Sequence, residues 1–365
     1  MTKPLLKLFN LDLHISVIAD IKDIAQSLYG TKVEITNWSI SGHNWVFRTH
    51  DRDVRVINQA TWRSINAKMI SEFQTIYDDF LSQFDGFIVT HTPVFCLLYE
   101  KYRKPILLVN SCRYEQPYSW SLDFTGWRWV SEGLLRLSDS GLLTVVSNNR
   151  ADQEYLLRGT GVRSAHIPSL CLYTGCSYRP VREEAVVFGD RGFFPESDLL
   201  VRKPERYTWS ELYSYKAIVH IPYEMSTMSL FEQYSAGIPL FLPSRAFYLE
   251  CIVSQKMPFG SIYSAHHDPK LIASSDLPFA LKESLSTGDF WLDRADFYDS
   301  ENFKYVRFYS SPQDLIRQLA DFVDTDREER LAWISQRKAR IYDMWRSVMF
   351  KHFFGTLPIE KLLSV

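Results

Sequence analysis

The sequence predicts an α/β protein of two domains, each built around a mostly parallel sheet. Its 365 residues are more than twice the roughly 150 residues of an average domain. Strand-like and helix-like segments alternate through the first half, lose their periodicity between Tyr173 and Arg182, and then alternate again. Strands that are joined by helical crossovers pair in parallel and carry helices on both faces. The order of segments therefore predicts two α/β layers in succession.

Short apolar runs separated by turn residues mark the strands of the first half. We expect these strands at Leu5–Leu11, Lys32–Ile40, Gly86–Thr90, Ile106–Val109 and Leu142–Val146. Helical spacing predicts helices at Ile15–Leu28, Ile65–Phe84 and Phe95–Tyr102, and one more near Arg150 that Ser147 caps and Gly159 ends.

The second half shows the same alternation of strands and helices and ends with a long helix. Strands are expected at Ala185–Gly189, Lys216–Pro222 and Ile238–Pro243, with a helix from Leu230 between the last two. A capping box at Thr325 and an apolar stripe that includes Ile341 and Trp345 predict a final helix from about Arg327 to Phe350. Since such a stripe needs an apolar partner, we expect this helix to pack back on the first domain. The expected domains are 1–170, 171–325 and the returning helix 326–365.

The charge balance and the cysteines exclude several classes of protein. Lys and Arg number 41 against 43 Asp and Glu, whereas a protein that binds duplex nucleic acid normally carries a basic excess. The uncharged run from Gly86 to Tyr99 is too short for a membrane span. The N-terminus lacks the apolar core of a secretion signal, so we expect a cytoplasmic protein. Five scattered cysteines predict free thiols and no zinc site.

The most informative segment runs from Ala217 to Ser244. It reads as a buried strand, a polar loop, a short helix that ends at Gly237, and a second buried strand. The loop and the helix start contain Ser226, Thr227, Met228 and Ser229. Backbone N–H groups at a helix N-terminus, placed at the carboxyl end of a parallel strand, favour a phosphate.

This segment resembles the C-terminal half of GT-B glycosyltransferases. Glu224 and Glu232 have the spacing of the two glutamates of the retaining members, and Ala236-Gly237-Ile238-Pro239 follows as in that class. The resemblance implies two Rossmann-like domains that face a central cleft. It also implies that Glu224 and the adjacent Tyr223 lie by the donor sugar, that the amides of residues 226–229 reach the diphosphate, and that Glu232 binds the ribose hydroxyls.

Two alternatives stay open in the donor half. Ser229-Leu-Phe-Glu232 also fits a capping box, in which Glu232 would serve the helix and no ligand. Arg191 and Lys203 are the cations expected to bind the diphosphate, since Arg can form two parallel hydrogen bonds to a phosphate and Lys acts as a point charge. Both could instead be ordinary surface charges.

Catalytic groups are expected at the carboxyl ends of the N-terminal strands. Asp12 and His14 follow the first strand and are the candidate catalytic pair, and His43 and His91 follow later strands and are candidates for acceptor binding. A carboxylate neighbour can tune a histidine into a general base. The alternative is that Asp12 and His14 merely cap the helix that starts near Ile15.

Together these features predict a glycosyltransferase for hexosyl or pentosyl transfer. Its co-substrate would be a UDP- or GDP-linked sugar, its acceptor a glycan, and it would need no metal or other cofactor. A sugar-nucleotide epimerase and a non-catalytic carbohydrate-binding protein on the same fold remain the alternatives.

Overall fold

A computed structural model describes residues 5–41, 43, 54–254, 270, 273–277, 281–282 and 288–356. The chain divides into two compact units. Unit 1 comprises Met1–Pro168, Ala273–Lys282 and Ile341–Val365, and unit 2 comprises Ser169–Ile272 and Glu283–Arg340. Each unit contains one parallel sheet, so the predicted α/β class with two sheets is confirmed.

The sheet of unit 1 has the strand order β2-β1-β3-β4-β5-β6, and every neighbouring pair is parallel. The strands are β1 Leu6–Asp12, β2 Val33–Ser39, β3 Gly86–Thr90, β4 Ile106–Asn110, β5 Leu143–Ser147 and β6 Ala165–His166. The first five match the predicted strands. The edge strand β6 was not predicted, because two residues are too few to show a periodicity.

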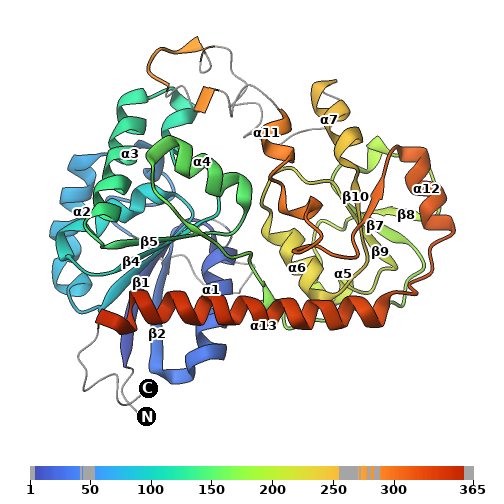
Figure 1. Ribbon diagram of the computed structural model, residues 1–365, viewed down its shortest axis with the longest axis horizontal. Helices are drawn as coiled ribbons and strands as arrows, with labels where there is room; N and C mark the ends of the chain where they lie inside the picture. Colours follow the sequence, from blue (N-terminus) through green and yellow to red (C-terminus); the bar gives the residue numbers. More distant parts are fainter. Residues whose placement is uncertain are drawn as a thin grey trace. The chain divides into compact units, whose positions relative to one another are not determined.

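Helices cover both faces of this sheet (Figure 1). They are α1 Ile15–Tyr29, α2 Ala67–Leu81, α3 Phe124–Asp139 and α4 Arg150–Thr160, with short 3-10 turns η1 Gly30–Lys32, η3 Trp62–Ser64, η4 Pro93–Leu98, η5 Glu100–Tyr102 and η6 Tyr118–Ser121. The chain goes from β1 to β2 through α1 and then skips back past β1 to β3 through α2. Right-handed crossovers put α1 and α2 on opposite faces.

Two of the predicted helices of unit 1 differ from the structure, and one helix was not predicted. The segment Phe95–Tyr102 forms the 3-10 turns η4 and η5. The cap of α4 is Asn149, whose side chain accepts from the Asp152 N–H, and the helix ends at Gly161 in a left-handed conformation. Ser147 stays in β5 and Gly159 inside α4, so both predicted limits were wrong by about half a turn. The helix α3, which the Asp123 side chain caps, was not predicted.

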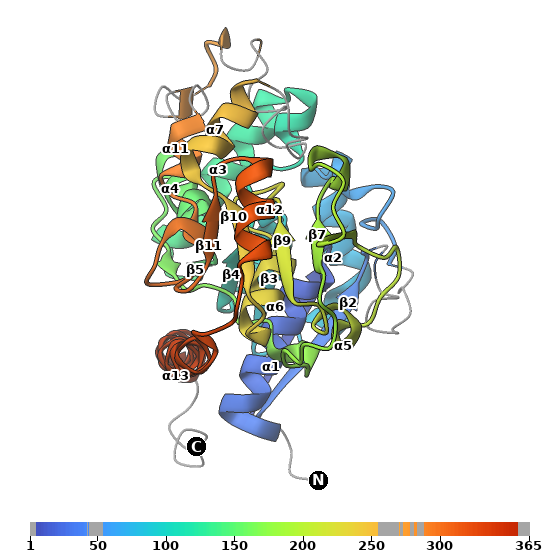
Figure 2. The ribbon, with the colours of Figure 1, turned by 90° about the vertical axis from the view of Figure 1, so that its right-hand side faces the viewer.

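The sheet of unit 2 has the order β11-β10-β9-β7-β8 and is also parallel throughout. Its strands are β7 Ala185–Phe188, β8 Leu200–Arg202, β9 Ala217–His220, β10 Leu240–Pro243 and β11 Arg307–Tyr309. The helices are α5 Trp209–Leu212, α6 Met228–Ala236, α7 Arg245–Val253, α11 Gly288–Leu292 and α12 Pro312–Ala320, with 3-10 turns η7 Leu172–Thr174, η8 Arg191–Phe193 and η9 Asp296–Tyr298. Figure 2 shows α12 beside β11.

The final helix α13, Arg327–His352, has 26 residues, and a last turn, η10 Phe354–Thr356, follows it. Residues up to Arg340 belong to unit 2 and residues from Ile341 belong to unit 1. Within unit 1, His352 Nδ1 lies 2.9 Å from Thr144 Oγ1 on β5, and Phe353 packs against Gly86 at the start of β3.

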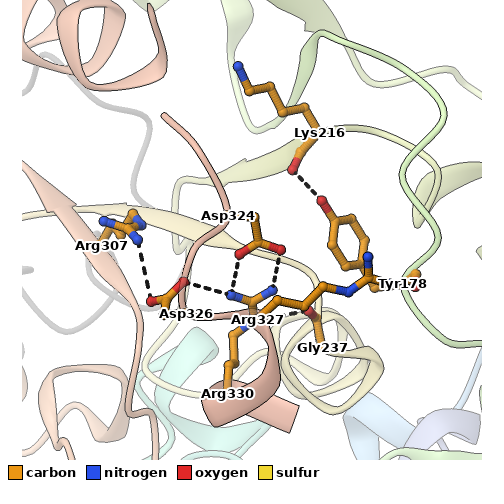
Figure 3. Close-up of polar contacts among 8 residues, drawn as sticks. All are labelled: Tyr178, Lys216, Gly237, Arg307, Asp324, Asp326, Arg327 and Arg330. Atoms are coloured by element: carbon orange, nitrogen blue, oxygen red, sulfur yellow. Dashed lines mark hydrogen bonds and ion pairs between the residues drawn. The ribbon is translucent and has the colours of Figure 1, made fainter. Parts of the chain in front are cut away.

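In unit 2 the start of α13 is held by a buried arginine (Figure 3). Arg330 forms two hydrogen bonds to Asp324, of 2.6 and 2.8 Å, and one to Asp326 of 3.1 Å. Its Nε donates to the carbonyl oxygen of Gly237 at the end of α6. The last helix is thereby fixed to the helix that follows β9. Among the described helices, none is long and apolar enough to cross a membrane.

Candidate functional site

The loop between β9 and α6 has the predicted architecture. The strand ends at His220, the helix begins at Met228, and Gly237 ends the helix with φ 81°. Thr227 is the N-cap residue, but its side chain makes no capping hydrogen bond. Backbone N–H groups of a first helical turn have no partner inside the helix, so the positive end of the α6 dipole lies at the carboxyl end of a central strand.

A buried histidine holds Thr227 in this arrangement. His220 is 1% exposed, and burial lowers its pKa to about 4, so the ring is neutral near pH 7. Its Nδ1 lies 2.8 Å from Gln233 Oε1 and its Nε2 lies 3.4 Å from Thr227 Oγ1. A neutral ring that donates to the glutamine oxygen accepts from the threonine hydroxyl. The Thr227 hydroxyl is therefore directed to His220 and away from the helix amides.

Glu232 on α6 is bound by aromatic side chains, and the capping-box alternative is wrong. Because α6 begins at Met228, Glu232 is its fifth residue and lies beyond the third position that a capping box requires. Its Oε1 accepts from the Tyr173 hydroxyl at 2.5 Å, and its Oε2 accepts from Trp209 Nε1 at 3.2 Å. The carboxylate is thus fixed beside the loop.

Further aromatic groups surround this carboxylate. Burial raises the pKa of Tyr207 to about 12, with smaller contributions from the charges of Glu232 and Tyr223. Tyr223 itself is exposed, whereas Glu224, the next residue, is half-buried. The structure therefore brings Tyr223 and Glu232 into one neighbourhood at the start of α6.

The two predicted cations of unit 2 differ in their surroundings. Arg191 lies in η8, where Nη1 donates to the Phe194 carbonyl at 3.0 Å and Nε to the Leu200 carbonyl at 3.4 Å. Its guanidinium thus holds its own loop. Lys203 Nζ lies 5.3 Å from the ring of Phe188 and 4.9 Å from that of Tyr207. The Phe188 ring in turn stacks on His220, so a chain of ring contacts connects Lys203 to the α6 loop.

In unit 1, Asp12 ends β1 as a fully buried carboxyl group. It accepts from Asn37 Nδ2 at 2.8 Å and from Ser39 Oγ at 3.0 Å, both on β2. Burial raises its pKa to about 6, although these hydrogen bonds oppose the shift. His14 is the N-cap residue of α1 but makes no side-chain capping bond. The interpretation of Asp12 and His14 as helix caps is therefore wrong.

Two further histidines lie near His14. The rings of His14 and His91 meet edge to face with centroids 5.7 Å apart, and His43 interacts electrostatically with His14. His91 and Thr92 follow β3 with φ 55° and 48°. Consecutive left-handed residues other than glycine are strained, and such strain gathers at functional sites. Burial lowers the pKa of His91 to about 3, with smaller effects from His14 and Arg113.

A buried polar cluster at the ends of β4 and β5 was missed from the sequence. Arg113 Nη1 lies 3.5 Å from Asp152 Oδ1, and both side chains are 3% exposed or less. Asn149 Nδ2 donates to the other oxygen of Asp152 at 2.7 Å. The run Asn148-Asn149-Arg150 directly after a strand was the available signal. Within the described part of the chain, no group of three or more His, Cys, Asp or Glu residues could hold a metal ion.

The chain is similar in structure to several solved proteins at low sequence identity. The glycotransferase of kitacinnamycin is 11% identical with a TM-score of 0.45, over 96% of this chain and 100% of that one. The S. aureus MnaA structure with UDP is 12% identical with a TM-score of 0.41, over 84% and 99% of the two chains. The glycosyltransferase SnogD from Streptomyces nogalater is 13% identical with a TM-score of 0.38, over 78% and 96%. No protein-family model and no curated protein sequence matches the chain.

Proposed function

We propose that the chain is a glycosyltransferase that moves a sugar from a nucleoside-diphosphate donor to a hydroxyl group of a glycan acceptor. The observation that carries the proposal is the start of α6, where the Thr227 side chain makes no capping hydrogen bond and Glu232 is fixed nearby. The dipole of a helix N-terminus attracts a diphosphate. The sequence resemblance to the GT-B class assigns the same segment to the donor.

In this proposal unit 2 binds the donor. The amides of Ser226 to Ser229 hold the diphosphate, and Lys203 and Arg191 supply positive charge. Glu232 accepts from the ribose hydroxyls, and Glu224 and Tyr223 lie by the sugar, which is a hexose or pentose on UDP or GDP. Fixed dipoles at the leaving diphosphate stabilise the negative charge that develops there without a metal ion.

Unit 1 supplies the base. As the bond forms between the acceptor oxygen and the anomeric carbon, the bond from that carbon to the diphosphate oxygen breaks, and the base takes the acceptor proton. Asp12 and His14 are the proposed catalytic groups, with His43 and His91 positioning the acceptor. A carboxyl group with a pKa near 6 is deprotonated close to pH 7 and can accept a proton there.

The proposal is tested by thermal melting with UDP, GDP, CMP and dTDP sugars, followed by product analysis. A ligand at about one hundred times its dissociation constant adds about 2.7 kcal/mol of stability. We expect one sugar nucleotide to raise the melting temperature and to release its nucleoside diphosphate only when a glycan acceptor is added. If an epimerised sugar nucleotide forms without an acceptor, the protein is an epimerase and not a transferase. If the protein binds a glycan and no nucleotide changes its melting temperature, it is a carbohydrate-binding protein without catalytic activity.

A further inference from the structure

The Glu232 carboxylate is enclosed by its two aromatic donors. Only 9% of Glu232 is exposed, and both oxygens accept hydrogen bonds from the protein. The bond from Tyr173 is 2.5 Å long, which is within the range of a charge-assisted O–H···O⁻ bond. A ligand hydroxyl that reaches Oε1 therefore meets an oxygen to which a phenol already donates.

The two hydrogen-bond donors of Glu232 belong to different structural elements. Trp209 is the first residue of the helix α5. Tyr173 lies in the three-residue turn η7 and is half-buried, and the residues on either side, Cys171 and Gly175, have φ 53° and 61°. Left-handed residues put a sharp bend at each end of this turn. Tyr173 is thus held by a short turn, whereas Trp209 is held by a helix that the Thr208 side chain caps.

We propose that Tyr173 is an exchange residue whose hydroxyl competes with a ribose hydroxyl of the nucleotide for Oε1 of Glu232. The inference rests on the proposed function, because it requires a nucleotide at the start of α6. Both competitors are O–H donors, and the burial of Glu232 leaves little room for both on one oxygen.

The exchange has a consequence for product release. A buried carboxylate without a hydrogen-bond donor is costly, so nucleotide departure is easier when Tyr173 takes the vacated bond. The tyrosine therefore weakens the binding of ribonucleotides and speeds the loss of the nucleoside diphosphate. A nucleotide without ribose hydroxyls leaves the bond between Tyr173 and Glu232 in place, and its affinity does not depend on the tyrosine.

Isothermal titration of Tyr173→Phe tests this exchange. The ligands are UDP and GDP, together with the 2′,3′-dideoxy counterpart of whichever binds more tightly. Because a hydrogen bond to a charged group contributes about 1.5 to 3 kcal/mol, removal of the competitor should tighten ribonucleotide binding by roughly tenfold or more. Affinity for the dideoxy nucleotide should stay within about twofold of the wild type.

Tyr178→Phe is the matched control. The Tyr178 hydroxyl donates to the Lys216 carbonyl at 2.9 Å in the same unit (Figure 3), so its loss should lower the melting temperature and leave both affinities unchanged. The Phe ring at position 173 keeps the packing, and a melting curve confirms folding. Equal or weaker ribonucleotide binding by Tyr173→Phe, or equal tightening of both ligands, would overturn the exchange while nucleotide binding stands. If neither protein bound any nucleoside diphosphate, the proposed donor site itself would be wrong, and the exchange with it.

Discussion

At the carboxyl edge of the sheet in unit 2, the candidate binding groups are backbone dipoles and one carboxylate held by aromatic donors. At the same edge in unit 1, the candidate groups are a buried carboxyl with a pKa near 6 and histidine side chains, of which His91 is neutral near pH 7 because burial lowers its pKa to about 3. His220 of unit 2 is also neutral, but it is enclosed at 1% exposure, with Gln233 as its partner. The comparison teaches that one architecture can hold fixed dipoles and a bound carboxylate at one sheet edge and titratable groups at the other.

The largest expected effect concerns the ion pairs of Arg330, which fix the start of α13 in unit 2. Arg330→Met removes a buried guanidinium that pairs with Asp324 and Asp326, and breaking a buried pair costs about 3 to 5 kcal/mol. Urea unfolding should show this loss in the free energy of unfolding. The control is Arg317→Met, which removes a guanidinium that is 74% exposed in its pair with Asp314 and should cost less than about 1 kcal/mol. Similar losses for both variants would contradict the role of Arg330.

The second prediction tests whether the candidate groups of unit 1 act as the base. Asp12→Asn and His14→Ala should each lower turnover by at least about a hundredfold, because a general base contributes about 10²- to 10⁴-fold. Nucleotide affinity, measured by titration, should stay within a few-fold. Asp123→Ala removes the cap of α3 in the same unit and should lower stability with little effect on turnover. Near wild-type rates in both Asp12 and His14 variants would direct the search for the base to His43 and His91.

The third prediction tests the fixed carboxylate of unit 2. Glu232→Gln should weaken nucleotide binding by about 1 to 3 kcal/mol, since hydrogen bonds to a charged acceptor are the stronger ones. Titration calorimetry measures the change, and Glu301→Gln, at an exposed carboxylate of the same unit, is the control. Lower stability with unchanged affinity would make Glu232 a structural residue only.

The smallest effect is expected from pH. A base acts in its deprotonated form, and burial raises the pKa of Asp12 to about 6. The apparent second-order rate constant should therefore rise with pH up to about 6 and then level off, with a loss of about tenfold per pH unit below that point. His91 stays neutral across this range because its pKa is about 3. An unchanged profile in Asp12→Asn would show that another group titrates.

The sequence predicted the strands of four or more residues and the α6 loop because these depend on local patterns, whereas the shorter strands β6, β8 and β11 were not predicted. The apolar runs before Asp12 and Glu224 and the stop at Gly237 are all visible within a few residues. The partners of the candidate groups could not be predicted in the same way. Tyr173 and Glu232 are 59 residues apart, and the contact between them depends on how η7 and α6 pack. No spacing rule links them.

The contact between Asp12 and Ser39 could have been predicted from the sequence. Parallel pairing of β1 with β2 puts Asp12 opposite Ser39, and an aspartate opposite a serine on one face predicts a hydrogen bond. The capping alternative for Glu232 failed for a different reason. The local pattern from Ser229 is a valid capping box, but the helix begins one residue before Ser229, and distant aromatic donors bind the carboxylate.

The division of α13 between the units bears on how the protein can be cut and expressed. A fragment that stops at Pro168 lacks Phe353, which is 0% exposed and packs on Gly86, and His352, which bonds to Thr144. Such a fragment would display the apolar surface that these residues cover, and we expect it to aggregate. In unit 2, Arg337 Nη2 donates to the Ser169 carbonyl at 3.2 Å, so the chain where it enters unit 2 at Ser169 runs close to the last residues of unit 2 in α13. A splice from residue 168 to residue 341 through a short flexible linker would therefore restore the end of α13 from Ile341 to His352, and it is a way to isolate the titratable edge for study by NMR.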